Sequence, residues 1–348
     1  MNDRSFPFVL GISLPTRVAR VSAPVRRDAA AIAEHIDRCD IDFVIVEDSP
    51  APGTTSTAGL TPVSLLGFLA PLTSTGLIAE VDASYVEPFF ASKSLATLDH
   101  VAAGRAGWQL RVDRSEAAAR KHGLAVALPD DELTERVVEY ADVVGGLWDS
   151  WESDAVVRDR ARGIFVDADR VHHLDHSGRY FSVRGPAILP RPPQGRLPLL
   201  ARLNGDSPPG DWQIAALTAD LVRVRAWSSP DLAAVRERLA RAGGDAAQRL
   251  LVDVGIQLPD NEGPQRVPEG LLALLDEITS AADGLVVDVG HAHGALAWVE
   301  DVLSPELKRR GLRVPPTDEN LTLRERLGLP PASNRFRPSA AMPAGEAS

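Results

Sequence analysis

Apolar and polar residues alternate between helix-like and strand-like patterns along most of the chain. From Phe89 to Gly104, apolar residues recur at every third or fourth position, and glycine ends the run, as at the end of a helix. Immediately afterwards Trp108, Leu110 and Val112 alternate with polar residues, which is typical of a β-strand. This stretch therefore predicts a helix that leads through a glycine turn into a strand.

The same alternation is repeated through the sequence. The predicted strands are 6–13, 42–48, 77–82, 107–113, 198–203, 220–225, 250–258 and 284–289. The predicted helices are 27–39, 62–73, 89–102, 131–151, 212–218, 230–242, 268–282 and 296–310. Some strands, such as DFVIVED at 42–48, are almost continuously apolar, as in parallel sheets that are buried on both faces. Eight strands that are each followed by a helix predict an α/β fold, a (β/α)8 TIM barrel.

Two segments depart from this alternation. Residues 153–196 lack helical periodicity and are rich in Gly, Pro, Asp and His, which predicts an insertion before the fifth strand, with a hairpin around His176. The histidines of this insertion are interpreted as structural. Residues 312–348 are expected to form a C-terminal tail, in which TLRERLGLPPASNRF packs back on the barrel and the last residues are disordered. The whole chain, 1–348, is predicted to be one domain.

Composition narrows the classes of function. Of the 348 residues, 44% are hydrophobic and 24% charged, which is ordinary for a globular protein with a large core. A net charge of −11 without a basic patch argues against a nucleic acid partner. The single cysteine, Cys39, excludes an internal disulfide and fits a reducing compartment. We find neither a signal-peptide pattern nor an apolar stretch of membrane-spanning length, so a cytoplasmic protein without membrane contact is expected.

Several long motifs resemble one known family. They are LATLDHVAAGRAGW, GLWDSWESDAVVRDRARGIF, VHHLDHSGRYFSVRGP followed by PRPPQGR, LSPELKRRGL and TLRERLGLPPASNRF. Together with the second strand they span Asp42 to about Phe336, and they resemble the flavin-dependent monooxygenases of the bacterial-luciferase-like superfamily. The resemblance is closest to the branch of nitrilotriacetate monooxygenase and dibenzothiophene sulfone monooxygenase. Members of that branch are usually longer, and residues 220–283 look compressed beside them.

The resemblance implies an activity and its partners. Enzymes of this superfamily use reduced FMN and oxygen to oxidise a small organic substrate, and a separate flavin reductase supplies the reduced FMN by diffusion. No nicotinamide-binding GxGxxG motif occurs, in keeping with such a division of labour. Dimers are common in the superfamily, and the apolar helical faces at 62–73 and 89–102 are consistent with a homodimer. The resemblance identifies no catalytic residue.

The residues that form the flavin site in the family match this sequence only in part. The cofactor-binding candidates are Asp48, Glu80, Gln109, Asp113, Asp206 and Ser207. Asp48 matches an Asp of the family, whereas Glu80, Gln109 and Asp113 replace residues that are smaller or uncharged. In the loop 204–210 the family offers small and hydroxyl residues to the flavin phosphate, but this chain has Asp206 and two prolines. Two like charges about 4 Å apart repel by roughly 4 kcal/mol at an effective dielectric constant of 20, which opposes a phosphate there.

Alternative interpretations stay open at this point. Carboxylates at the ends of the predicted strands can equally cap helices or pair with arginines. His291 and His293 follow the eighth strand and could bind a metal with Asp288, but this spacing is a weak signal and we predict no metal. The acidic replacements and the short chain support a second hypothesis, a flavin-free barrel that acts as a binding protein or partner subunit. Metal-dependent hydrolysis is a more distant third.

Overall fold

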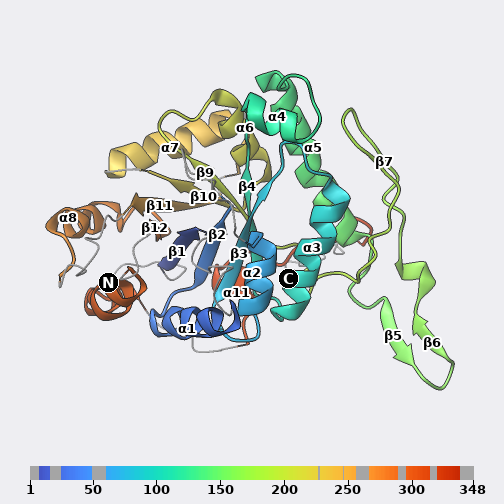
Figure 1. Ribbon diagram of the computed structural model, residues 1–348, viewed down its shortest axis with the longest axis horizontal. Coiled ribbons are helices and arrows are strands. Elements are labelled where there is room, and N and C mark those ends of the chain that lie inside the picture. The colour runs from blue at the N-terminus through green and yellow to red at the C-terminus, as the bar shows by residue number, and fades with distance from the viewer. Residues whose placement is uncertain are drawn as a thin grey trace, which may run out of the picture.

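Eight parallel strands close into a barrel in the computed structural model, which describes residues 8–15, 25–48, 60–225, 228–245, 247–255, 266–288, 295–313 and 320–337 (Figure 1). The barrel strands are β1 (Val9–Pro15), β2 (Phe43–Glu47), β3 (Gly76–Asp82), β4 (Ala106–Arg111), β9 (Leu199–Leu203), β10 (Leu221–Val224), β11 (Arg249–Gly255) and β12 (Gly284–Asp288). Their order around the barrel is β1-β12-β11-β10-β9-β4-β3-β2, so neighbours in sequence are neighbours in space. The predicted (β/α)8 fold is confirmed.

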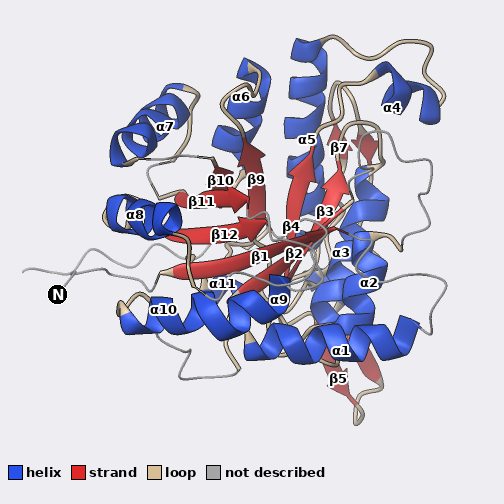
Figure 2. Ribbon diagram, turned by 60° about the vertical axis from the view of Figure 1, so that its left-hand side comes forward, coloured by secondary structure: helices blue, strands red, loops and turns tan. Residues whose placement is uncertain are grey.

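Helices surround the barrel on its outside, as Figure 2 shows. They are α1 (Val25–Arg38), α2 (Pro62–Leu69), α3 (Pro88–Val101), α4 (Glu116–Lys121), α5 (Asp130–Asp149), α6 (Pro209–Thr218), α7 (Ser229–Arg241), α8 (Glu269–Ile278), α9 (Ala295–Trp298), α10 (Ser304–Arg309) and α11 (Leu323–Arg326). The sequence analysis did not predict α4, because six residues are too few to show a periodic face. A π-helical turn at Val299–Leu303 divides the run predicted at 296–310. Within the described residues, no helix is long and apolar enough to cross a membrane.

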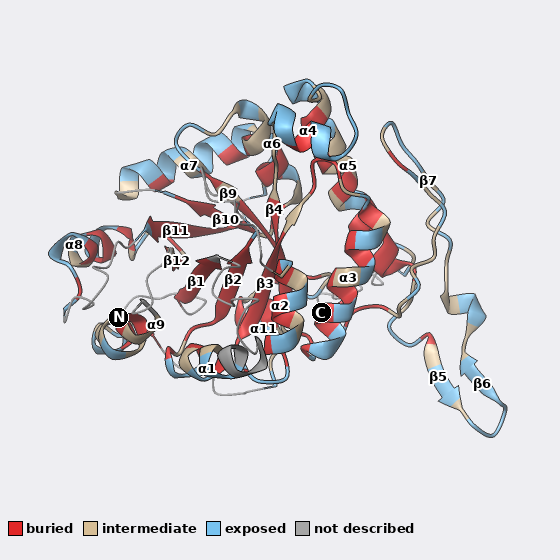
Figure 3. Ribbon diagram, viewed as in Figure 1, coloured by how far each residue is buried: buried red, intermediate tan, exposed pale blue. Residues whose placement is uncertain are grey.

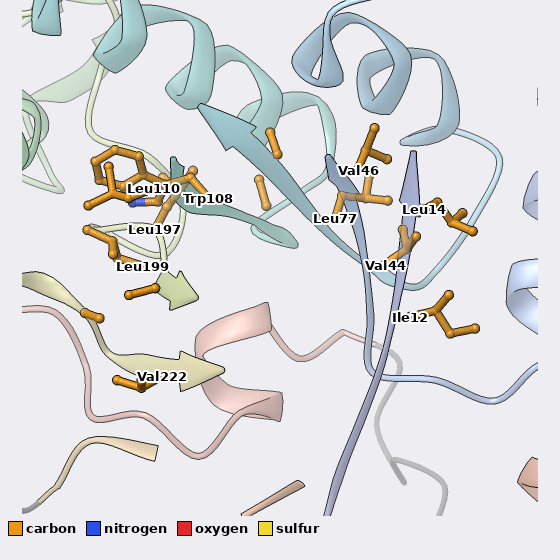
Figure 4. Packing of buried hydrophobic residues seen from close by; sticks show 14 of the residues in the cluster. Ile12, Leu14, Val44, Val46, Leu77, Trp108, Leu110, Leu197, Leu199 and Val222 are labelled. Atoms are coloured by element: carbon orange, nitrogen blue, oxygen red, sulfur yellow. The ribbon is translucent and has the colours of Figure 1, made fainter. Parts of the chain in front are cut away.

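The main core lies between the strands and the surrounding helices. Outward-facing strand residues such as Ile12, Val44 and Leu77 are buried there, and Figure 4 shows them with Trp108 from β4. In Figure 3 the strands are buried along most of their length, whereas the helices are buried on one face only. Burial on both faces of the sheet explains the continuous apolar runs of the sequence. Cys39 is also buried, as expected of a small apolar side chain.

The C-terminal tail closes the amino end of the barrel. Leu323 and Leu327, in and next to α11, belong to the same apolar cluster as Val9 and Phe43 inside the barrel. Space for Leu323 comes from glycine, because a Cβ added at Gly76 would lie only 2.6 Å from its Cδ1 atom. The prediction that this tail packs back on the barrel is confirmed, and the expectation of disorder at 338–348 lies outside the described residues.

The insertion at 153–196 extends to one side of the barrel (Figure 1). It contains two small hairpins, β5 (Val156–Asp159) with β6 (Ile164–Val166), and β7 (His176–Ser177) with β8 (Ser182–Val183). The second is the hairpin predicted around His176, whose ring contacts the Glu139 carboxylate at 2.9 Å. Asp149, at the end of α5, is fully buried and forms ion pairs with Arg191, Arg196 and Arg335. This carboxylate therefore joins the insertion and the C-terminal tail to α5.

Candidate active site at the carboxyl end of the barrel

The interior of the barrel is apolar at its amino end and polar at its carboxyl end. Side chains alternate between the two faces of a strand, so every second residue points inward. The inward residues nearest the carboxyl ends are Ser13, Glu47, Glu80, Gln109, Arg202, Arg223, Asp253 and Asp288. This is the end at which TIM barrels place their active sites.

Arg223 of β10 is the centre of this polar layer and is fully buried. Its Nη1 atom donates to Glu47 Oε1 at 2.6 Å, and its Nη2 atom donates to Asp253 Oδ1 at 2.9 Å. Longer contacts of 3.4 Å reach Ser13 Oγ and Gln109 Oε1. Because these partners come from β2, β11, β1 and β4, one side chain connects strands from opposite sides of the barrel.

Arg202 of β9 shares carboxylates with Arg223. Its guanidinium contacts Glu47 at 3.2 Å, Asp253 at 3.1 Å and Asp288 at 3.3 Å. Burial alone would raise the pKa of the Glu47 carboxyl, but the two arginines lower it, and the net shift is downward. Glu47 is therefore held as a carboxylate by its partners.

The pKa of Glu80 of β3 is shifted in the opposite direction, upward. Its side chain is 6% exposed, and it accepts hydrogen bonds from Gln109 Nε2 at 2.8 Å and from the Asp48 backbone N–H at 3.1 Å. Arg111 lies 3.5 Å away but is also paired with Asp82 and Asp113. Burial, with the nearby charge of Glu47, raises the pKa of Glu80 to about 7. Glu80 can therefore gain or lose a proton near neutral pH.

A cavity of about 260 Å³ opens beside Glu80, between β3, β4, β9 and the start of α6. Its lining residues are Glu80, Gln109, Leu110, Arg111, Val112, Ala201, Arg202, Asn204, Ser207, Asp211 and Ile214. The volume is near the lower end for a small-molecule site, and mixed polar and apolar walls suit an organic ligand. The arrangement can bind and orient a small molecule next to an ionisable carboxyl group.

The predicted site residues fall in different places. Glu80, Gln109 and Ser207 line the cavity, while Asp48 contacts Glu80 through its backbone. Asp113 pairs with Arg111, as in the arginine-pairing interpretation, and accepts the backbone N–H of Ser115, the N-cap residue of α4, at 3.0 Å. Asp206 is exposed in the turn after β9 and does not line the cavity.

Of the possible metal site formed by Asp288, His291 and His293, the structure describes only Asp288. His291 and His293 lie outside the described residues, and Asp288 pairs with Arg202. Among the residues that the structure describes, no group of three potential metal ligands occurs.

Sequence reasoning missed the central ion pairs. Arg223 and Asp253 stand within apolar strands, as LVRV and LLVDV, at positions that point inward. A charged residue at an inward position of a barrel strand is the signal that could have identified them. The partners could not be named, because Glu47 lies 176 residues from Arg223 in the sequence.

Fold and site together define a TIM-barrel protein with a polar cavity at the catalytic end of the barrel. A sequence model of the luciferase-like monooxygenases matches residues 9–259, and the chain belongs to this family. It is 30% identical to nitrilotriacetate monooxygenase component A of Aminobacter aminovorans over 290 residues, which cover 76% of this chain and 61% of that protein. It is 32% identical to one of the subunits of the pristinamycin IIA synthase of Streptomyces pristinaespiralis over 289 residues, 83% of each chain.

The comparisons also confirm the fold and the branch. The crystal structure of a long-chain alkane monooxygenase superposes with a TM-score of 0.76 at 18% identity, covering 93% of this chain and 96% of that one. Dibenzothiophene-sulfone monooxygenase of Rhodococcus erythropolis is 37% identical over 163 residues, which cover 44% of this chain and 36% of that protein, so the resemblance to this branch is confirmed. The chain spans less than half the length of several curated relatives.

The flavin phosphate expected from the family does not fit the loop 204–210. Ser207 Oγ accepts the backbone N–H of Asn204 at 2.8 Å, so this side chain offers an anion only its single hydroxyl proton. Pro208 and Pro209 have no N–H to donate. Asp211, in the first turn of α6, places a carboxylate where an anion would approach, and pairs with Arg114 at 2.6 Å.

Proposed function

We propose that this chain is an FMN-dependent two-component monooxygenase that oxidises a small organic substrate. The observation that carries the proposal is the family match over residues 9–259, which includes the three strands that line the cavity. In this proposal a separate flavin reductase supplies reduced FMN by diffusion. One oxygen atom of O₂ enters the substrate and the other leaves as water, with two electrons from the reduced flavin.

The residues of the chain would bind and orient the substrate. Leu110, Val112 and Ile214 supply the apolar part of the cavity wall, while Gln109 and Asn204 can hydrogen-bond to a polar group. The cavity volume of about 260 Å³ favours a small molecule. The ion pairs beneath it hold these strand ends together, so that the bound molecule meets a fixed wall.

The second candidate is a flavin-free partner subunit. The loop 204–210 supports it, as does the similarity to a protein named as one subunit of a synthase over 83% of both chains. The comparisons do not favour it, because most of the relatives are named as monooxygenases. The two candidates differ in whether this chain binds flavin by itself.

Reoxidation of the flavin tests the proposed function without knowledge of the substrate. Anaerobically reduced FMN is mixed with excess protein and then with oxygenated buffer in a stopped-flow spectrometer. We expect the time course of flavin absorbance to differ from that of free reduced FMN, because bound flavin is partly shielded from solvent. Albumin at the same concentration is the control. Identical time courses with and without the chain would contradict the proposal.

We also propose that the chain forms a homodimer through α2 and α3. These helices contact each other and expose Phe68 (51%) and Phe90 (67%), and Leu72 (45%) is exposed in the turn after α2, so that a second copy could cover all three. Sedimentation at micromolar concentration should give twice the chain mass of 37.3 kDa. The double variant Phe68→Asp/Phe90→Asp should sediment as a monomer, because it would place charges in an apolar interface.

Phe165 provides the matched control for this prediction. It is 64% exposed but lies in β6 of the insertion, so Phe165→Asp should leave the dimer intact. A monomeric wild-type protein, or dissociation caused by Phe165→Asp instead of the double variant, would show that α2 and α3 do not form the interface.

A further inference from the structure

The charged groups at the carboxyl end of the barrel are unequal in number. Four arginines of the described residues pair there with eight carboxylates. The arginines are Arg111, Arg114, Arg202 and Arg223. The carboxylates are Glu47, Glu80, Asp82, Asp113, Asp130, Asp211, Asp253 and Asp288. Each arginine is shared between at least two carboxylates, so the described residues of this region carry more carboxylates than arginines.

The arginines of the cavity are therefore poor partners for a further anion. Arg111 contacts three carboxylates within 3.5 Å, and Arg202 contacts three within 3.3 Å. A phosphate could bind either guanidinium only by displacing a carboxylate or by accepting repulsion from it. A flavin phosphate would carry between one and two negative charges near neutral pH, as a phosphate monoester does.

The loop after β9 does not offset this repulsion of a phosphate. Two of its residues are prolines, which have no N–H to donate, and Asp206 adds an exposed carboxylate, whereas Ser207 keeps one hydroxyl proton to donate. Uncharged parts of a flavin meet none of these obstacles, because an isoalloxazine ring and a ribityl chain need apolar surface and hydrogen bonds. The cavity wall provides both, for example at Ile214 and Gln109.

We propose that this chain does not recognise the phosphate group of a flavin, and that it binds riboflavin at least as tightly as FMN. The inference rests on the proposed function, since it assumes that a flavin binds at the carboxyl end of the barrel. It differs from the cofactor preference expected of the family, and the cause is the excess of carboxylates among the described residues together with the two prolines and Asp206 of the loop 204–210. The ring and the ribityl chain then carry the affinity.

Arg225 is a further cation among the described residues at this end of the barrel. It follows β10, is exposed, and its Nη2 atom lies 3.2 Å from the position of a Cβ added at Gly255. It does not line the cavity. A phosphate placed over β10 and β11 would lie near this guanidinium, so the experiment includes Arg225.

Direct binding to the full chain tests the inference. Dissociation constants of FMN and riboflavin, oxidised and reduced, are measured by flavin fluorescence or calorimetry at low ionic strength. We expect the Kd of FMN to equal that of riboflavin or to exceed it by up to about tenfold, with a difference that shrinks as salt screens the repulsion. Asp206→Ser should lower the Kd of FMN severalfold and leave that of riboflavin unchanged, and Asp206→Asn should act in the same direction.

The outcomes separate this inference from the proposed function. FMN that binds more tightly than riboflavin, beyond the error of the measurement, would overturn the inference alone, and loss of that preference in Arg225→Ala would locate the phosphate at β10. Binding of neither flavin would overturn the proposed function itself and support a flavin-free subunit. If Asp206→Ser changed the Kd of FMN and the Kd of riboflavin equally, the inference would also be contradicted. The loop would then not act on the phosphate group.

Discussion

Replacing Arg223 by methionine is expected to lower the free energy of unfolding by about 3–5 kcal/mol. Methionine fills a similar apolar volume but leaves Glu47 and Asp253 without the guanidinium that lies 2.6 and 2.9 Å from them. Arg202 can compensate only in part, because it is already shared with Asp288. Uncompensated carboxylates inside the barrel should therefore destabilise the folded state strongly. Urea unfolding, followed by circular dichroism and tryptophan fluorescence, measures the change.

Arg225→Met is the matched control for this variant. Arg225 follows the same strand two residues later but is exposed, so its replacement should change the free energy of unfolding by no more than about 0.5 kcal/mol. The triple variant Glu47→Gln/Arg223→Met/Asp253→Asn removes the uncompensated charges and should recover part of the loss. A loss below about 1 kcal/mol in Arg223→Met would show that these buried ion pairs do not form in solution.

The second large effect concerns Glu80 and pH. Its folded pKa of about 7 lies above the ordinary value of 4.5, so the folded state holds this proton more tightly than the unfolded chain does. Tighter binding of this proton contributes about 3 kcal/mol to the free energy of unfolding. This contribution is fully present below pH 4.5 and is lost as pH rises through 7. Glu80→Gln cannot ionise and should abolish this loss. The difference in unfolding free energy between variant and wild type should therefore grow from pH 5 to pH 8.

The surroundings of Glu80 determine how large this effect is. Burial and the carboxylate of Glu47 raise its pKa, whereas Arg111, Gln109 and the backbone N–H of Asp48 lower it. Glutamine offers only one oxygen to two donors, so a lost hydrogen bond should subtract about 1 kcal/mol at every pH. The exposed Glu116→Gln serves as control and should follow the wild-type curve. If the free energy of unfolding of Glu80→Gln changes with pH in the same way as that of wild type across this range, Glu80 does not titrate near pH 7.

The order of strands and helices could be read from the sequence because local periodicity and burial agree in this fold. Each parallel strand is covered on both faces, so DFVIVED and similar runs are apolar throughout, and the predicted strand at 42–48 agrees with Phe43–Glu47 to within one residue. Glycine turns and long amphipathic helices mark the boundaries in the same local way. The short helix Glu116–Lys121 escaped prediction because it has no repeated apolar face.

The candidate site was only partly visible for a different reason. Glu80 and Gln109 were identified because they stand at positions that match the flavin site of the family, and both line the cavity. Their neighbours Glu47, Arg202 and Arg223 were not, since their pairing depends on which residues point inward and on the closure of the barrel. Asp113 and Asp206 were equally plausible in sequence, but tertiary structure places Asp113 in an ion pair with Arg111 and Asp206 in an exposed turn. Periodicity along the chain thus determined the fold, whereas contacts between residues more than a hundred positions apart decided which charges share the barrel mouth.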